Sequence, residues 1–195
     1  MKSPDYLSEE LLAQSTRVVN GFTLHGCMLG LSESITGGTI ASFLARVDGC
    51  SKILFASQAL YSIPGKSSFL DVPIEEIEDK GTVSEFIIEK MNECMARRFF
   101  TVLPSMAAAR PRSFISLAIC GVAGSAIENL PRGTVIIGMD TYSIPDENSN
   151  EIVPTGHEME WFQFDGDRAT IILRASSQAL FWLEGVPFLS TETNI

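Results

Sequence analysis

Two hydroxyl side chains, Ser34 and Thr36, stand directly before the glycine pair Gly37 and Gly38. An apolar, strand-like run leads into these residues, and an apolar pattern with helical spacing begins at Thr39, so we expect a strand-to-helix turn. Such a turn directs peptide N–H groups and the positive end of a helix toward one point, which suits an anion or a developing negative charge. A purely structural interpretation stays open, in which Thr36 caps the helix and the glycines permit tight packing.

A second group of chemically capable residues lies between Tyr61 and Lys66. Pro64 and Gly65 interrupt the chain here and predict a loop. A lysine accepts a proton from a serine hydroxyl only when its amine is neutral, a form that burial favours. Lys66 is therefore a candidate base if the fold brings it to Ser34, and otherwise an ordinary solvated lysine.

A third candidate group combines a glycine-bearing turn, Gly121 to Gly124, with Arg168. The turn follows a predicted strand at 114–120, and ligands of open α/β folds bind where the carboxyl ends of parallel strands meet. Arg168 opens the last predicted helix, where a positive charge opposes the helix dipole. Either an anionic ligand or a neighbouring aspartate would compensate it, and the sequence leaves both alternatives open.

The spacing of apolar residues predicts the elements that must position these groups. The first predicted helix begins near Ser8 and ends at Gly21 or Gly26, and further helices are predicted at 39–47, 74–80, 83–100 and 165–183. Strands are predicted at 27–31, 53–61, 114–120, 133–139 and 159–164. Segments 101–113 and 146–156 are expected to be connectors. With 195 residues, 45% of them hydrophobic and 19% charged, the chain is expected to form one packed domain.

Composition excludes several classes of function. A net charge of −10 argues against binding to nucleic acid, whose phosphates would be repelled. Four scattered cysteines, Cys27, Cys50, Cys94 and Cys120, predict free thiols in a reducing compartment, and the pair His25 and Cys27 is too small a set of ligands for a metal site. The first residues lack the apolar core of a signal peptide, and no run approaches the roughly 20 apolar residues of a membrane span. We expect a cytoplasmic protein that does not associate with membranes.

Several short segments occur together in a specific order. They are Glu33-Ser34-x-Thr36-Gly37-Gly38, Tyr61-Ser62-x-x-x-Lys66, Gly81-x-Val83-Ser84-Glu85 with Met91, Gly121-x-Ala123-Gly124, Gly133-Thr134-Val135, and Phe164-x-Gly166-x-Arg168 with Arg174. The ordered set, which spans a core of about residues 8–185, resembles the CinA C-terminal domain family, whose enzymatic members are nicotinamide-nucleotide amidases. The resemblance implies a single-domain, three-layer α/β/α fold with a mixed, mostly parallel five-stranded sheet in which one strand is antiparallel. It also implies homodimers.

The same resemblance implies hydrolysis of the carboxamide of nicotinamide mononucleotide (NMN) to nicotinic acid mononucleotide and ammonia, without a metal or an organic cofactor. Ser34 and Lys66 would then form a Ser/Lys dyad, and Tyr61 would orient the lysine or relay its proton. Peptide N–H groups of the two glycine turns would hold the oxyanion or the phosphate, with Arg168 as the cation for the phosphate. The implied substrate-binding residues are Thr36, Gly37, Gly38, Cys120, Gly121, Gly124 and Arg168.

The chain departs from the family pattern at four positions. Ile35 replaces a cysteine, Ile63 an asparagine, Cys120 a hydroxyl residue and Ser125 a proline. We expect Cys120 to remove a hydrogen-bond donor from the pocket, and Ile63 to alter the aim of Lys66. The chain also lacks the additional N-terminal domain of many family members, which predicts a free-standing protein.

Two alternatives to an NMN amidase stay open. One is a diverged nucleotide-binding or regulatory protein without turnover, which the four departures favour. The other is an amidase for a different small amide, with the same dyad and a reshaped pocket.

Overall fold

The computed structural model of the chain describes residues 4–106, 110–127, 129–145 and 151–189. Its elements, in order, are α1 (Pro4–His25), β1 (Cys27–Glu33), α2 (Thr39–Leu44), η1 (Cys50–Lys52), β2 (Leu54–Ala59), α3 (Ile63–Leu70), α4 (Ile74–Lys80), α5 (Glu85–Val102), η2 (Leu103–Ser105), β3 (Ser113–Gly121), β4 (Thr134–Ser143), β5 (Val153–Gln163) and α6 (Arg168–Leu189).

One five-stranded sheet in the order β2-β1-β3-β4-β5 forms the centre of the molecule. β1 runs parallel to β2 and β3, whereas β4 runs antiparallel to both of its neighbours. Four strands therefore point in one direction and β4 in the other, which confirms the mixed sheet with a single antiparallel strand.

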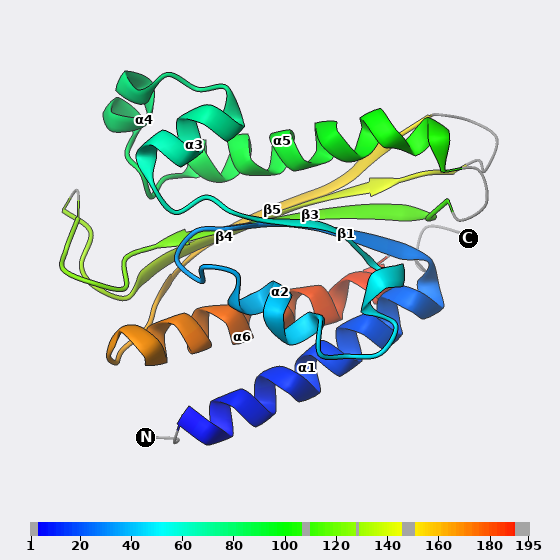
Figure 1. Ribbon diagram of the computed structural model, residues 1–195, viewed down its shortest axis with the longest axis horizontal. Helices are drawn as coiled ribbons and strands as arrows, with labels where there is room; N and C mark the ends of the chain where they lie inside the picture. Colours follow the sequence, from blue (N-terminus) through cyan, green and yellow to red (C-terminus); the bar gives the residue numbers. More distant parts are fainter. Residues whose placement is uncertain (1–3, 107–109, 128, 146–150, 190–195) are drawn as a thin grey trace.

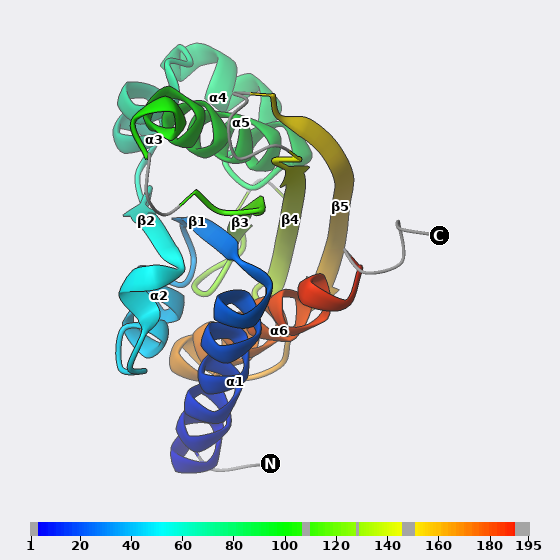
Figure 2. The same cartoon turned by 90° about the vertical axis from the view of Figure 1, so that its right-hand side faces the viewer.

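The helices form a layer on each face of the sheet, as Figures 1 and 2 show. α1, α2 and α6 lie on one face, and α3, α4 and α5 lie on the other. Buried side chains fill both interfaces, with Phe22, Leu44 and Leu180 in the first and Ile77, Ile88 and Met91 in the second. The three-layer α/β/α architecture is thus confirmed.

The carboxyl ends of the parallel strands meet at one edge of the sheet. Glu33, the last residue of β1, pairs with Ala59 of β2 on one side and with Ile119 of β3 on the other. The segments that leave these strands, beginning at Ser34, Leu60 and Val122, therefore emerge side by side. This is the edge at which the sequence predicted a ligand site.

The segment before Lys66 differs from its prediction, because it is the start of a helix and not a loop. α3 begins at Ile63, and the hydroxyl of Ser62 accepts a hydrogen bond from the N–H of Gly65 at 3.2 Å. Pro64 occupies the first turn, where its missing N–H would have had no helical partner. Lys66 consequently projects from a rigid helical turn.

Several other boundaries were also predicted wrongly, among them the starts of two elements. α1 begins at Pro4 and not at Ser8, and β5 begins at Val153, inside the predicted connector 146–156. Residues 146–150 of that connector lie outside the described ranges. Between Pro154 and Glu158, β5 carries no large apolar side chain. The first half of the strand therefore shows little apolar alternation.

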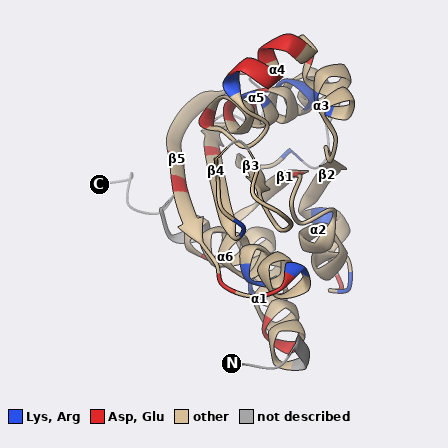
Figure 3. Cartoon of the chain, turned by 90° about the vertical axis from the view of Figure 1, so that its left-hand side faces the viewer, with Lys and Arg blue, Asp and Glu red and all other residues tan. Residues whose placement is uncertain are grey.

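The predicted acidic helix is α4, whose carboxylates face solvent at one end of the α3–α5 layer (Figure 3). All four cysteines are free and buried. Within the described ranges, no group of His, Cys, Asp or Glu side chains could hold a metal ion. In the same part of the chain, no helix is both long and apolar enough to cross a membrane.

Candidate active site

Ser34 is fixed to the edge of the sheet by its own backbone. It directly follows β1, and its N–H donates to the carbonyl of Ile119 in β3 at 2.9 Å. Its side chain is almost fully buried. The hydroxyl is therefore held in place by the central strands.

Lys66 meets Ser34 from the α3 layer. The Nζ atom of Lys66 donates to the Oγ of Ser34 at 2.9 Å and to the carbonyl of Leu60, also at 2.9 Å. Only 3% of Lys66 is exposed, and among the described residues no ion pair includes it. A neutral amine in this position could accept the serine proton across the same contact, which is the geometry that a general base requires.

The turn after Ser34 is organised by Glu33, a residue whose role the sequence analysis did not assign. The Glu33 carboxylate is fully buried and accepts N–H groups of Gly38 at 3.0 Å, Ile40 at 3.2 Å and Ala41 at 3.0 Å. Its charge satisfies the N–H groups at the start of α2, where the helix dipole favours an anion. The sequence did contain a signal for this role, because an acidic residue shortly before a predicted helix can accept the free N–H groups of its first turn.

The N–H groups of the two glycines in this turn already donate to acceptors within the protein, so they are not available to a ligand in this conformation. Gly37 donates to the carbonyl of Ser34 at 3.1 Å, and Gly38 donates to Glu33. Both glycines have positive φ angles, 58° and 98°, which explains the residue type. Their contribution to substrate binding stays a prediction. It would require their N–H groups to leave Ser34 and Glu33 and to donate to the substrate.

Thr36 does not cap α2, so the purely structural interpretation of this residue is wrong. The N-cap of α2 is Gly38, which has no side-chain cap. The Thr36 side chain is buried, and its Oγ1 has no hydrogen-bond partner in the described part of the chain.

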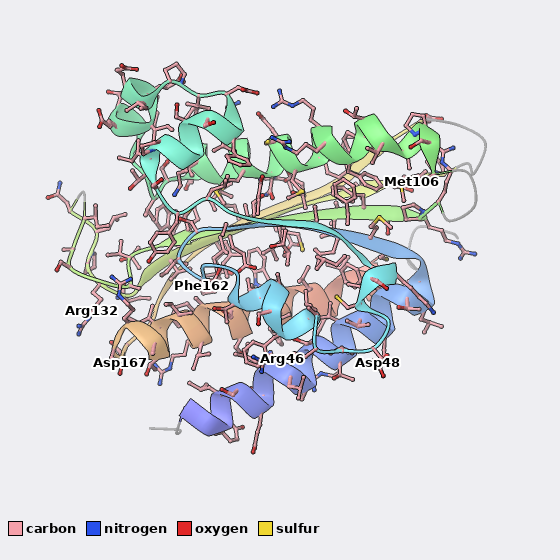
Figure 4. All side chains as sticks on the ribbon, viewed as in Figure 1. Arg46, Asp48, Met106, Arg132, Phe162 and Asp167 are labelled. Carbon is pink, nitrogen blue, oxygen red and sulfur yellow. The ribbon has the colours of Figure 1, made fainter. Side chains whose placement is uncertain are left out.

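Arg168 lies against two of the other predicted residues, Tyr61 and Gly124. Its Nη1 donates to the hydroxyl of Tyr61 at 3.0 Å, and a Cβ atom added to Gly124 would lie 2.7 Å from its Nη2. No ion pair joins Arg168 to Asp165 or Asp167 within the described ranges, so compensation by a neighbouring aspartate is not observed. Figure 4 shows Arg132 and Asp167 at this same end of the sheet, on the β3–β4 connection and before α6.

Tyr61 lies with the arginine and not with the lysine. Its side chain is 60% exposed, and its only described hydrogen bond is the one from Arg168. The structure thus joins Ser34 with Lys66 and Tyr61 with Arg168, while a role for Tyr61 in moving the proton stays a prediction.

Comparison with known proteins places this arrangement in a family. The sequence model of the CinA C-terminal domain matches residues 12–186. The chain belongs to the CinA C-terminal domain family. Proteins of two Streptococcus pneumoniae strains, ATCC 700669 and 70585, named competence-damage inducible protein, are 32% identical to it over 123 residues, which is 63% of the chain and 27% of each relative. The chain thus spans about a quarter of the length of these curated relatives.

Solved structures of CinA proteins share the fold. A CinA superfamily protein from Klebsiella pneumoniae 700603 aligns with a TM-score of 0.69 and 22% identity, over 92% of this chain and 98% of that one. A competence/damage inducible protein from Agrobacterium tumefaciens aligns with a TM-score of 0.66 and 24% identity, over 89% and 93%. At these identities the likeness concerns the fold.

Two departures of this CinA domain from the family pattern lie in packed layers. Ile35 is buried in the core beneath α2 and α6, where its Cδ1 would be 2.8 Å from a Cβ added to Gly121. Ile63 packs as the first residue of α3 against the opposite core. Ile63 was expected to change the direction in which the Lys66 side chain points. The structure shows no misdirected lysine, because the Lys66 amine contacts the Ser34 hydroxyl.

Cys120 is the departure that lies beside the dyad. It is fully buried in β3, with its Sγ 3.5 Å from the Sδ of Met91. Burial raises the pKa of the Cys120 thiol, while the nearby Lys66 amine and Ser34 hydroxyl lower it by less. The thiol is therefore neutral near pH 7 and is a weaker donor than a hydroxyl.

A separate hollow of about 840 Å³ is lined mainly by α5, with further residues from the end of α3, from α4 and from β4. Its lining includes Phe86, Lys90, Arg97 and Tyr142 and none of the candidate residues. Its mixed charges and open shape indicate no particular chemistry.

Proposed function

We propose that this CinA domain is an amidohydrolase that converts NMN to nicotinic acid mononucleotide and ammonia through a Ser34–Lys66 dyad. The observation that carries the proposal is the 2.9 Å contact between the Lys66 amine and the Ser34 hydroxyl. Both side chains are buried, and the acceptors of the lysine are neutral oxygens. A lysine amine in direct contact with a serine hydroxyl has the geometry that a general base for that hydroxyl needs.

The reaction would proceed in two balanced steps. The Ser34 oxygen attacks the carboxamide carbon while its proton passes to Lys66, and the tetrahedral intermediate then expels ammonia with that proton. The resulting ester of Ser34 is hydrolysed by water, whose proton Lys66 accepts and returns to the serine oxygen. The acid is released and the dyad is restored.

The phosphate of the substrate would bind at Arg168. A protein with a net charge of −10 needs a local cation to attract an anionic substrate. The guanidinium of the exposed Arg168 donates to Tyr61 and lies against Gly124, at the same edge of the sheet as the dyad.

A second candidate function is nucleotide binding without turnover. The observation that favours it is Cys120, because a neutral buried thiol beside the dyad replaces a hydroxyl of the family pattern. Binding of NMN in calorimetry without release of ammonia would support this candidate.

Ammonia release from NMN tests the leading proposal. The unmodified protein should release ammonia, and Ser34→Ala should reduce the rate by at least about 1000-fold. Ser42→Ala, which changes an exposed serine on α2, is the matched control and should keep the full rate. Release that survives Ser34→Ala would exclude the dyad.

A further inference from the structure

The hydroxyl of Tyr61 lies on the arginine side of the candidate site. Its oxygen accepts a hydrogen bond from Nη1 of Arg168 at 3.0 Å, although 107 positions of the chain separate the two residues. Tyr61 lies in the segment that leads from β2 to α3, whereas Arg168 opens α6, so the contact joins segments that belong to opposite helical layers (Figure 1). It ties the phenol to the residue that we assign to the substrate phosphate.

The Tyr61 ring is directed away from the layer that carries Lys66. The preceding residue, Leu60, is buried in the core beneath α3 and α5. The Tyr61 ring instead approaches the turn before α2, because a Cβ atom added to Gly37 would lie 3.9 Å from its Cε2. The ring therefore lies beside the turn that follows Ser34, with its hydroxyl directed to the start of α6.

Lys66 makes its hydrogen bonds without Tyr61. Its Nζ donates to the Oγ of Ser34 and to the carbonyl of Leu60, and 3% of Lys66 is exposed, compared with 60% of Tyr61. A group that orients this amine or relays its proton must come within hydrogen-bond reach of the amine or of the serine oxygen. Among the described residues, no hydrogen bond joins the Tyr61 hydroxyl to either atom.

The Tyr61 hydroxyl is suited to donate to an anion. A tyrosine hydroxyl carries one donor and also accepts hydrogen bonds. Because its oxygen accepts from the Arg168 guanidinium, its proton is left to donate, and the side chain is exposed enough for a ligand to reach it. A hydrogen bond from a cation polarises the hydroxyl and strengthens it as a donor. A phosphate beside Arg168 would thus receive hydrogen bonds from both side chains.

We infer that Tyr61 binds the substrate phosphate together with Arg168, rather than acting on the proton that passes between Ser34 and Lys66. This inference rests on the proposed function, from which it takes the place of the phosphate at Arg168. It gives Tyr61 a role other than the one that the family resemblance implies. The ligand class is a phosphate monoester such as NMN.

Binding of the reaction product measures this role without catalysis. Nicotinic acid mononucleotide carries the phosphate but no carboxamide, and nicotinic acid riboside carries neither group. In calorimetry, Tyr61→Phe should raise the Kd of the mononucleotide by about 3–10-fold, because one hydrogen bond to a charged group is lost. The Kd of the riboside should not change. Tyr6→Phe, which removes the hydroxyl of an exposed tyrosine on α1, is the matched control and should change neither value.

Steady-state kinetics distinguish phosphate binding from proton relay. With NMN, Tyr61→Phe should raise KM by the same factor as the Kd and keep kcat within about twofold. With nicotinamide riboside, which lacks the phosphate, both constants should match those of the unmodified protein. A loss of kcat by about 100-fold or more with both substrates would place the hydroxyl in the proton transfer and overturn the inference.

The outcomes separate this inference from the proposed hydrolysis. If the unmodified protein releases no ammonia but Tyr61→Phe selectively weakens binding of nicotinic acid mononucleotide, the hydrolysis fails and the inference stands. If ammonia release requires Ser34 but Tyr61→Phe binds the mononucleotide as tightly as the unmodified protein does, the function stands and the inference is wrong. If the unmodified protein binds neither NMN nor its product, both fail.

Discussion

The Nζ atom of Lys66 lies 2.9 Å from the Oγ atom of Ser34, although 32 positions separate the two residues in the sequence. Ser34 leaves the central strand β1, and Lys66 projects from the first turn of α3 in the layer above. The proline at the second position of α3 and the Ser62 cap fix the start of that helix. Both partners thus come from rigid parts of the fold, as a catalytic pair requires.

Replacement of Lys66 by methionine should separate catalysis from stability. Removing the base should lower kcat by about 10²–10⁴-fold. The apolar side chain suits a buried site, so the free energy of unfolding should change little. Lys52→Met, at an exposed lysine of η1, is the control for ammonia release and urea denaturation. A variant that loses its fold along with its activity would contradict this separation.

Arg168→Met should weaken binding of the phosphate and leave the chemical step intact. Loss of a charged hydrogen-bond donor corresponds to an increase of KM for NMN by about 10–100-fold. Nicotinamide riboside, which lacks the phosphate, should be hydrolysed equally by both proteins. If the variant is impaired equally with both substrates, Arg168 does not act through the phosphate.

Glu33→Gln should destabilise the turn that carries Ser34. The amide presents an NH₂ group to the donors of α2, so the free energy of unfolding should fall by about 2–4 kcal/mol. Urea denaturation measures this change. Glu158→Gln, on the exposed strand β5, should shift it by less than about 0.5 kcal/mol. Equal stability of the two variants would refute the capping role.

Stability should fall as the pH rises above about 9, and Cys120 contributes to this fall. Burial raises the pKa of its thiol above the ordinary value of 9.0. The unfolded chain therefore loses this proton at a lower pH than the folded protein does, and the stability present below pH 9.0 declines above it. Burial also raises the pKa of Cys27 and Cys50, with the same sign.

Urea denaturation at pH 8 and pH 10 tests this prediction, because these values bracket the ordinary pKa of 9.0. Cys120→Ala should lose less stability across this interval than the unmodified protein. An identical loss in both proteins would show that Cys120 does not contribute.

The sequence predicted the architecture well because the central strands are continuous apolar runs. β1, β3 and β4 are buried over most of their length, so their composition alone marks them. β5 is an exposed edge strand, and the half of it that precedes Met159 carries no such signal. For the same reason its start was misplaced.

The candidate site was less accessible to sequence reasoning. Pro64 and Gly65 predict a loop by local chemistry, and only the packing of α3 shows them as a helix start. The role of Glu33 depends on where its carboxylate points, and the chain order does not give that direction. Ile35 directly follows Ser34 in the chain, and only the packing of the fold shows that its side chain lies in the core.

The most direct test of the account is the covalent intermediate on Ser34. NMN mixed with the protein and quenched within one turnover should give a species heavier by the mass of NMN less ammonia, and peptide mapping should place it on Ser34. Ser34→Ala should give no such species. A turnover that proceeds without an ester, or an acyl group found on Cys120, would contradict the Ser34–Lys66 mechanism.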